Sequence, residues 1–180
     1  MIVTPTDFKG LLVLEPKVHG DARGYFMESY NKKTFAEAGI DVNWVQDNQS
    51  RSSQGVLRGL HFQRRPYDQT KLVRVLSGTV LDVVVDLRRS EPTFGKPYAI
   101  EISAENKKQV LVPKGFAHGF VVLSETAEVF YKCDQFYNPQ ADGGIHFKSI
   151  VLDWMLPENK LILSDKDKNL PLIENANFDF

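Results

Sequence analysis

The side chains that could support catalysis in this chain are four histidines, one cysteine and a few tyrosines and lysines. The histidines are His19, His61, His118 and His146, and the cysteine is Cys133. An imidazole can bind a metal ion or act as a base near neutral pH, because its unperturbed pKa is about 6.5. A single cysteine permits neither an intrachain disulfide nor a thiolate-rich metal site. The composition therefore allows either a histidine-based metal centre or proton transfer.

The segment Pro113-Lys114-Gly115-Phe116-Ala117-His118 resembles the second signature of cupins, the jelly-roll barrels in which Pro-x-Gly-x-x-His turns into a barrel strand. Metal-binding cupins also present His-x-His and a glutamate from an earlier motif. Here His61 stands alone, with Gln63 where a second histidine would be. Lys71 occupies the glutamate position, with six residues between it and Gly78. An ammonium is a poor ligand and repels a divalent ion, so no metal site is predicted.

A histidine, a lysine and a tyrosine within one barrel form a set that suits proton transfer next to a carbonyl group. A neutral histidine is a competent base. A tyrosine, whose pKa is about 10, is protonated near neutral pH and can act as an acid. A fixed lysine cation stabilises the negative charge that develops on an enolate oxygen. This chemistry removes a proton beside the carbonyl and returns a proton elsewhere.

Strand alternation gives a partial test of where these side chains point. Within residues 127–133, alternation places Tyr131 on a small, apolar side, so we expect Tyr131 to face the barrel interior. The same rule sends Arg58 and His61 to opposite faces of their strand. A bulge at Gly59 would realign the two side chains.

The elements that must position these residues are mostly short strands separated by Gly, Pro, Asn and Asp. Residues 71–87 predict a hairpin that turns at Ser77-Gly78-Thr79, and further strands are predicted at 98–102, 109–112, 120–123 and 125–133. A short helix is predicted at 32–38, with Asn31 as N-cap and Gly39 as the stop. We therefore predict one all-β domain over residues 1–180, a cupin jelly-roll barrel with short peripheral helices.

Charge and hydropathy exclude several classes of partner. The net charge is −1, from 22 basic and 23 acidic residues, which argues against an electrostatic nucleic-acid binder. No apolar run is long enough to span a bilayer, and residues 1–7 lack the features of a signal peptide. A cytoplasmic protein with neither nucleic-acid nor membrane partners is expected.

Seven segments, in order along nearly the whole chain, resemble the dTDP-4-dehydrorhamnose 3,5-epimerases, which are cupin enzymes of deoxysugar synthesis. These segments are residues 20–28, 46–50, 55–63, 71–75, 113–120, 131–132 and 163–167. The resemblance implies inversion at carbons 3 and 5 of a dTDP-4-keto-6-deoxyhexose, in biosynthesis of the dTDP-rhamnose type. It also implies a homodimer that uses neither a metal nor an organic cofactor.

The resemblance also assigns roles to individual residues. His61 matches the base, Asp167 its carboxylate partner, and Tyr131 the acid on the opposite face of the sugar. Lys71 matches the cation near the keto oxygen, and the planar fork of an arginine suits a diphosphate. The positions that match substrate-binding residues are Arg23, Phe26, Glu28, Gln46, Asn48, Arg58, His118, Asp142 and Lys166.

One segment departs from the family pattern. Asp142 stands where the family usually has Glu, residues 143–150 lack its Trp-Asn-Asp-Pro run, and Met155 follows Trp154 where Pro is usual. Three alternatives therefore stay open: an epimerase of a single carbon, a metal-dependent cupin enzyme, and a nucleotide-sugar-binding module without activity. His19 and His146 are expected to have no catalytic role.

Overall fold

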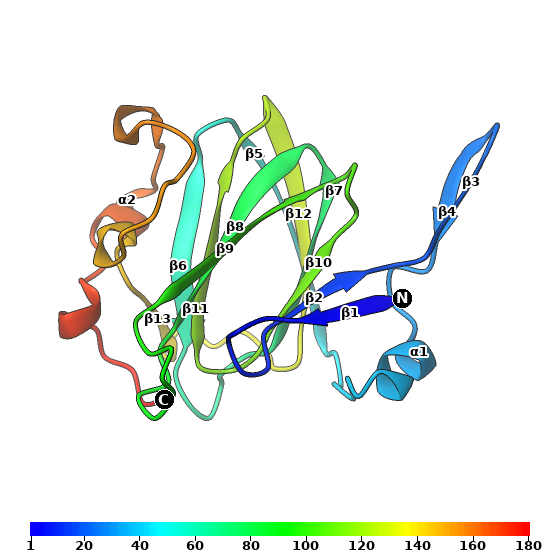
Figure 1. Cartoon of the computed structure of the whole chain (residues 1–180). Helices are drawn as coiled ribbons and strands as arrows, with labels where there is room; N and C mark the ends of the chain where they lie inside the picture. Colours follow the sequence, from blue (N-terminus) through cyan, green and yellow to red (C-terminus); the bar gives the residue numbers. More distant parts are fainter.

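Two antiparallel sheets face each other in the computed structural model, which describes residues 1–180, and short helices lie outside them (Figure 1). The first sheet has the order β1-β2-β10-β7-β12-β5, with bounds Ile2–Pro5, Leu12–Glu15, Gln109–Val112, Lys71–Ser77, Thr126–Cys133 and Gln46–Ser53. The second has the order β13-β6-β11-β8-β9, with bounds Asp142–Gly144, Leu57–Gln63, Phe116–Val122, Thr79–Asp86 and Pro97–Ser103. The prediction of an all-β jelly roll with short peripheral helices is confirmed.

The predicted strands agree closely with the observed ones. The hairpin of β7 and β8 turns at Gly78, whose φ of 75° is readily adopted only by glycine. Strand β10 has the predicted bounds, β9 extends one residue beyond the predicted strand at each end, and β12 begins one residue later than predicted. Strand β11 begins at Phe116, four residues before the predicted start, because the cupin turn leads directly into the strand.

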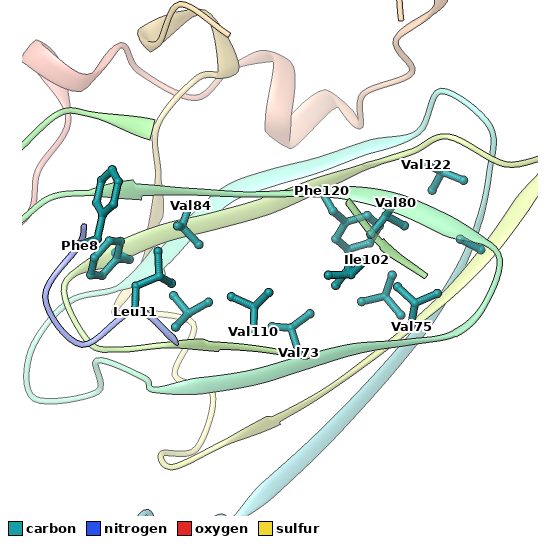
Figure 2. Packing of buried hydrophobic residues seen from close by; sticks show 14 residues of the cluster. Phe8, Leu11, Val73, Val75, Val80, Val84, Ile102, Val110, Phe120 and Val122 are labelled. Atoms are coloured by element: carbon teal, nitrogen blue, oxygen red, sulfur yellow. The ribbon is translucent and has the colours of Figure 1, made fainter. Parts of the chain in front are cut away.

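A cluster of 14 buried apolar residues packs between the two sheets (Figure 2). Val73 and Val110 come from the first sheet, and Val84, Ile102 and Phe120 come from the second. Both sheets thus bury one face in a common interior. At about 25 cal/mol per Å² of apolar surface, this burial is the main stabilising contribution to the barrel.

Strand β8 is buried on both faces because the C-terminal segment covers the outside of its sheet (Figure 1). Leu81, Val83 and Val85 pack outward against Phe147 and Trp154. This segment contains three short 3₁₀ turns (Phe147–Ser149, Glu158–Lys160 and Ile173–Asn175) and α2 (Asp165–Lys168). The covering segment explains why the outward side of β8 is apolar.

Helix α1 (Lys32–Glu37) begins at the predicted residue and ends one residue before the predicted end. The Asn31 side chain accepts hydrogen bonds from two backbone N–H groups of the first turn, and Gly39 follows the helix with a φ of 80°. Its buried Phe35 packs on the outer face of the six-stranded sheet, in a cluster with Leu14 and Leu72. No helix of the structure is long and apolar enough to cross a membrane.

A two-stranded hairpin, β3 (Val18–Asp21) and β4 (Gly24–Met27), projects away from the two sheets beside α1 (Figure 1). Its strands pair only with each other. Tyr25 and Phe26 are 59% and 67% exposed on it, although large aromatic side chains are usually buried. The hairpin therefore presents apolar surface that this chain does not cover.

Candidate active site

A cavity of about 590 Å³ lies between the sheets, in the size range of ligand-binding pockets. Strands β5, β6, β7, β11 and β12 and residues 162–167 contribute to its walls. The polar residues that line it are Asn48, Gln49, Ser50, Arg58, His61, Lys71, His118, Tyr131, Ser164, Lys166 and Asp167. All four predicted catalytic positions therefore meet at one cavity.

His61 and Asp167 form a hydrogen-bonded pair in its wall. His61 Nε2 lies 2.6 Å from Asp167 Oδ1, and Asp167 is 3% exposed. Burial alone would raise the pKa of the Asp167 carboxyl, but hydrogen bonds from His61, Ser164 and the Gly59 backbone hold that pKa below its ordinary value. The carboxylate therefore fixes the ring with Nε2 as donor and leaves Nδ1 available as a base.

The short helix α2 supplies this carboxylate. The Ser164 hydroxyl is its N-cap and accepts a hydrogen bond from the Asp167 backbone N–H at 3.1 Å. The same turn places Lys166 at the cavity, where its ammonium pairs with Asp142 of β13. One helical turn thus delivers both an anion and a cation to the site.

A bulge between β6 and β11 brings Arg58 and His61 to the same cavity. The pairing shifts between the partners of His118 and Phe120, so alternation is broken at this point. Gly59 has a φ of 122°, and a Cβ there would lie 2.7 Å from the Gly119 Cα. The predicted bulge at Gly59 is confirmed, and only glycines permit the close backbone approach.

Lys71 lies at the start of β7, opposite Cys133 of β12. Burial lowers the pKa of its ammonium, while Cys133, Asp82 and Asp142 act in the opposite direction. Burial also raises the pKa of the Cys133 thiol to about 11, so this thiol is neutral near pH 7. The two carboxylates therefore oppose the effect of burial and favour the charged form of Lys71.

Tyr131 faces the barrel interior, as alternation predicts, and packs against the interior cluster that contains Ala127 and Val129. Burial is the main reason that the pKa of its phenol lies above the ordinary value. The Lys71 ammonium is 5.6 Å from the centre of the Tyr131 ring. A protonated phenol and a cation thus lie together on the six-stranded sheet.

His118 is paired across the sheet with His61, because the two residues are direct partners of β11 and β6. Its Nε2 lies 2.7 Å from Oδ2 of Asp82, and the two residues are 6% and 1% exposed. The cavity is therefore bordered by two His–Asp pairs on neighbouring strands.

Four of the predicted binding residues line the cavity, namely Asn48, Arg58, His118 and Lys166. The Arg58 Nε donates a hydrogen bond to the Ser52 hydroxyl at 3.0 Å, which aims the guanidinium. Gln46 supports Asn48 through a 3.0 Å hydrogen bond between their side-chain amides and lies outside the lining itself.

Arg23, Phe26 and Glu28 lie on or next to the β3–β4 hairpin and do not line the cavity of their own chain. The Arg23 guanidinium is 90% exposed and pairs with Asp21. Glu28 contacts Asn31 at the start of α1. These three predicted binding residues are therefore not brought together with the others within one chain.

Gln63, at the position of a second histidine in metal-binding cupins, links two loops. Its amide nitrogen donates to the carbonyl oxygens of Tyr67 and Phe136 at 2.7 and 3.2 Å, and its oxygen accepts from the Asn138 N–H at 2.6 Å. No group of three or more His, Cys, Asp or Glu side chains is placed to hold a metal ion. The donors of this barrel do not fit a metal centre.

The cavity also contains residues that the sequence did not single out. Ser50 and Ser164 add hydroxyls, and Val56, Ile162 and Leu163 add apolar surface. A parallel bridge between Val56 and Ile162 attaches the covering segment beside β6. Because this contact joins residues far apart in the chain, no local pattern indicated it.

The site's chemistry follows from which sheet holds each group. His61, the predicted base, comes from the five-stranded sheet, and Tyr131 and Lys71, the predicted acid and cation, come from the six-stranded sheet. A molecule held between the sheets would meet a base on one side and a phenol on the other. This arrangement suits removal of a proton from one face of a carbon and delivery of a proton to the other face.

Comparison with known proteins identifies one family over nearly the whole chain. The family model described as dTDP-4-dehydrorhamnose 3,5-epimerase matches residues 5–175. The chain is 54% identical to the dTDP-4-dehydrorhamnose 3,5-epimerase of Shigella flexneri over 172 residues, which cover 94% of each chain. The crystal structure of the corresponding enzyme from Elizabethkingia anophelis is similar, with a TM-score of 0.94, 52% identity and 99% coverage of both chains. A Legionella pneumophila 3,5-epimerase, solved in complex with dTDP-4-keto-L-rhamnose, has a TM-score of 0.93, 45% identity and coverage of 98% of this chain and 94% of its own.

Proposed function

This chain belongs to the dTDP-4-dehydrorhamnose 3,5-epimerase family of isomerases, and from this premise we propose that it inverts both carbons that flank the keto group of dTDP-4-dehydro-6-deoxy-D-glucose. The product is dTDP-4-dehydro-L-rhamnose, formed in dTDP-rhamnose biosynthesis. The observation that carries the proposal is the placement of His61 and Tyr131 on opposite sheets of one cavity.

In the proposed mechanism, His61 Nδ1 takes the proton from the carbon next to the carbonyl. The C–H electron pair forms the enolate, whose oxygen carries the negative charge beside the Lys71 ammonium. The Asp167 carboxylate, 2.6 Å from Nε2, stabilises the imidazolium that results. Loss of a positioned cation or donor at such an oxygen typically costs about 100- to 1,000-fold in rate.

The phenol of Tyr131 then gives its proton to the same carbon from the opposite face, which inverts the centre. One inversion leaves His61 protonated and Tyr131 deprotonated, so both groups exchange a proton with solvent before the second carbon reacts. The raised pKa of Tyr131 favours the protonated phenol that this step requires. The two inversions need no oxidant, reductant or further reactant.

Deuterium incorporation tests the proposal directly. We expect that the wild-type protein, incubated in heavy water with dTDP-4-dehydro-6-deoxy-D-glucose, places deuterium at carbons 3 and 5 of the sugar. His61→Ala should abolish the exchange at both carbons while its thermal unfolding stays close to that of the wild type. Exchange that survived in this variant would contradict the assigned base.

The same experiment separates the alternatives. Deuterium at one carbon alone would indicate a single-site epimerase, and tight nucleotide binding without exchange would indicate a binding module. A metal-dependent cupin enzyme would hold a stoichiometric transition metal after purification without chelator. The replacement of its glutamate ligand by Lys71 argues against that alternative.

We also propose that the active form is a homodimer in which the β3–β4 hairpin of each copy reaches the cavity of the other. Three observations support this arrangement: the hairpin projects from its own chain, its aromatic side chains are exposed, and Arg23, Phe26 and Glu28 are absent from the lining of the cavity. In this arrangement the Arg23 of a second copy binds the diphosphate.

A further inference from the structure

The proposed mechanism uses the His61–Asp167 pair and leaves the second pair, His118–Asp82, without a role. The two pairs have the same form: in each, Nε2 of the histidine meets a carboxylate of 3% exposure or less, at 2.6 Å and 2.7 Å. They lie side by side because His61 and His118 are direct partners of β6 and β11.

Asp82 is a charged residue in a place where the barrel otherwise has valine. It lies between Val80 and Val84 on the inward face of β8, and both neighbours belong to the interior cluster. An unpaired buried carboxylate costs several kcal/mol, so the fold alone would favour a third apolar residue here. His118 is the one hydrogen-bonding partner of the Asp82 side chain, and the carboxylate does not line the cavity.

The partner of Asp82 does reach the cavity, beside Lys71. His118 and Lys71 both line it, and both also border a small closed space of about 10 Å³ that lies next to it. The hydrogen bond to Asp82 occupies Nε2 of His118, and Nδ1 has no partner in the structure. Nδ1 is therefore the nitrogen that is free to meet a substrate.

The titratable groups that act on Lys71 come from three neighbouring strands. They are the carboxylates of Asp82 on β8 and Asp142 on β13 and the neutral thiol of Cys133 on β12, while the histidines on β6 and β11 and Tyr131 share the cavity. Of the two carboxylates, Asp142 already pairs with Lys166, whereas Asp82 pairs with His118 and with no lysine or arginine. Asp82 is thus the carboxylate near Lys71 whose charge no lysine or arginine side chain neutralises.

We propose that Asp82 is a positioning residue, which holds His118 as an imidazolium whose Nδ1–H donates, together with Lys71, to the oxygen of the enolate. This role rests on the proposed function, because it assumes that an enolate oxygen forms there. His118 then donates from Nε2 to Asp82 and from Nδ1 to the substrate. Asp82 contacts no substrate and acts through His118 and, by its charge, on Lys71.

Asp82→Asn tests the proposal, because it removes the charge and keeps the shape. We expect kcat for epimerisation to fall by about 10- to 100-fold, less than the loss of a donor itself, with KM changed by less than about threefold. We also expect the alkaline limb of the pH–rate profile to move to lower pH, since Lys71 loses a neighbouring negative charge. If Asp82 had a purely structural role, the substitution would change neither kcat of the folded enzyme nor the alkaline limb of its pH–rate profile.

The chain offers a matched control in Asp86, a buried carboxylate on the same strand that pairs with Arg88 and Thr93 and does not line the cavity. Asp86→Asn should lower the stability to urea and leave kcat and the alkaline limb of the folded enzyme unchanged. If Asp82→Asn does not fold, Asp82→Val, which matches Val80 and Val84, should fold and show at least the same loss of kcat.

A double-mutant cycle tests whether Asp82 acts through His118. In a His118→Asn background, Asp82→Asn should cost less than about threefold in kcat, because the groups act as a unit. Additive effects, or a folded Asp82→Asn with the kcat and alkaline limb of the wild type, would overturn the proposal. Absence of exchange in the wild type contradicts the proposed function instead, and nitrogen NMR of labelled histidine still reports whether Asp82→Asn changes the tautomer of His118.

Discussion

At the scale of single residues, strand alternation predicts where Tyr131 points but does not predict the position of Asp167. The inward position of Tyr131 follows from the small, apolar residues at every second position of its strand. Asp167 has no such signal, because the surrounding Asp165-Lys166-Asp167-Lys168 by itself indicates an exposed loop. Its burial follows from the docking of α2 beside His61, a contact between residues more than one hundred positions apart.

Lys71 gives a testable pH dependence. Because burial lowers the pKa of Lys71, its ammonium loses the proton below the ordinary lysine value of about 10.4. If the cation is required, kcat is full below that pKa and falls as pH rises through it. We expect Lys71→Arg to be slower at neutral pH but to show no such fall, since arginine stays charged. A pH–rate profile of both enzymes up to pH 10 is the measurement, and an unchanged limb in Lys71→Arg would assign it to another group.

Tyr131→Phe should separate proton removal from inversion. The His61–Asp167 pair is intact in this variant, so the base still removes the proton and can return one from solvent to the same face. We expect deuterium to enter the sugar while epimerised product falls by about 100-fold or more. Nuclear magnetic resonance of the recovered sugar measures both quantities. Equal loss of exchange and inversion would show that Tyr131 is needed before the enolate forms.

At the scale of elements, strands β7 to β12 and the first helix were predicted because each is specified by local patterns, whereas β1 to β5 and β13 were not predicted. The alternation in β8, the glycine turn at Gly78 and the cap at Asn31 are all within a few residues of the element they define. The register of β6 on β11 is different, since the bulge requires two glycines from separate strands to meet. Gly59 is visible in the sequence, whereas its contact with Gly119 is a property of the assembled sheet.

Two glycines with nearly equal φ values provide a controlled test of this contact. Gly59 and Gly24 have φ of 122° and 123°, but a Cβ at Gly59 would overlap the backbone of Gly119, and a Cβ at Gly24 would meet nothing within 4 Å. Gly24→Ala should cost about 1–3 kcal/mol from backbone strain alone. We expect Gly59→Ala to cost at least about 2 kcal/mol more in urea unfolding. Equal costs would show that the close approach does not constrain the bulge.

At the scale of the whole molecule, some residues that the sequence predicts for the binding site do not line the cavity of their own chain. The motif of residues 20–28 resembles a nucleotide-binding segment, yet the structure places it on a hairpin that leaves its own barrel. Local sequence cannot show which copy a projecting segment serves. The exposed Tyr25 and Phe26 are the structural sign that the hairpin is unpartnered within one chain.

Mixed dimers test this arrangement. His61→Ala removes the base, and Arg23→Glu repels the diphosphate. If Arg23 serves the partner's cavity, each mixed dimer contains one site with neither substitution, so random mixing in equal amounts restores about a quarter of all sites. The activity of coexpressed variants, compared with each variant alone, is the measurement. No recovery would place Arg23 in the site of its own chain or outside any site.

The covering segment also follows every strand of the two sheets in the order of synthesis. All strands of both sheets end by Gly144, so the nascent chain carries the complete barrel and the base His61 before α2 has been translated. Asp167, which fixes His61, arrives close to the C-terminus at Phe180. A chain cut after β13 would therefore keep every strand of both sheets and lack the carboxylate that orients its base. In the proposed mechanism, the translation of α2, rather than that of the last strand, completes the pair of His61 and Asp167.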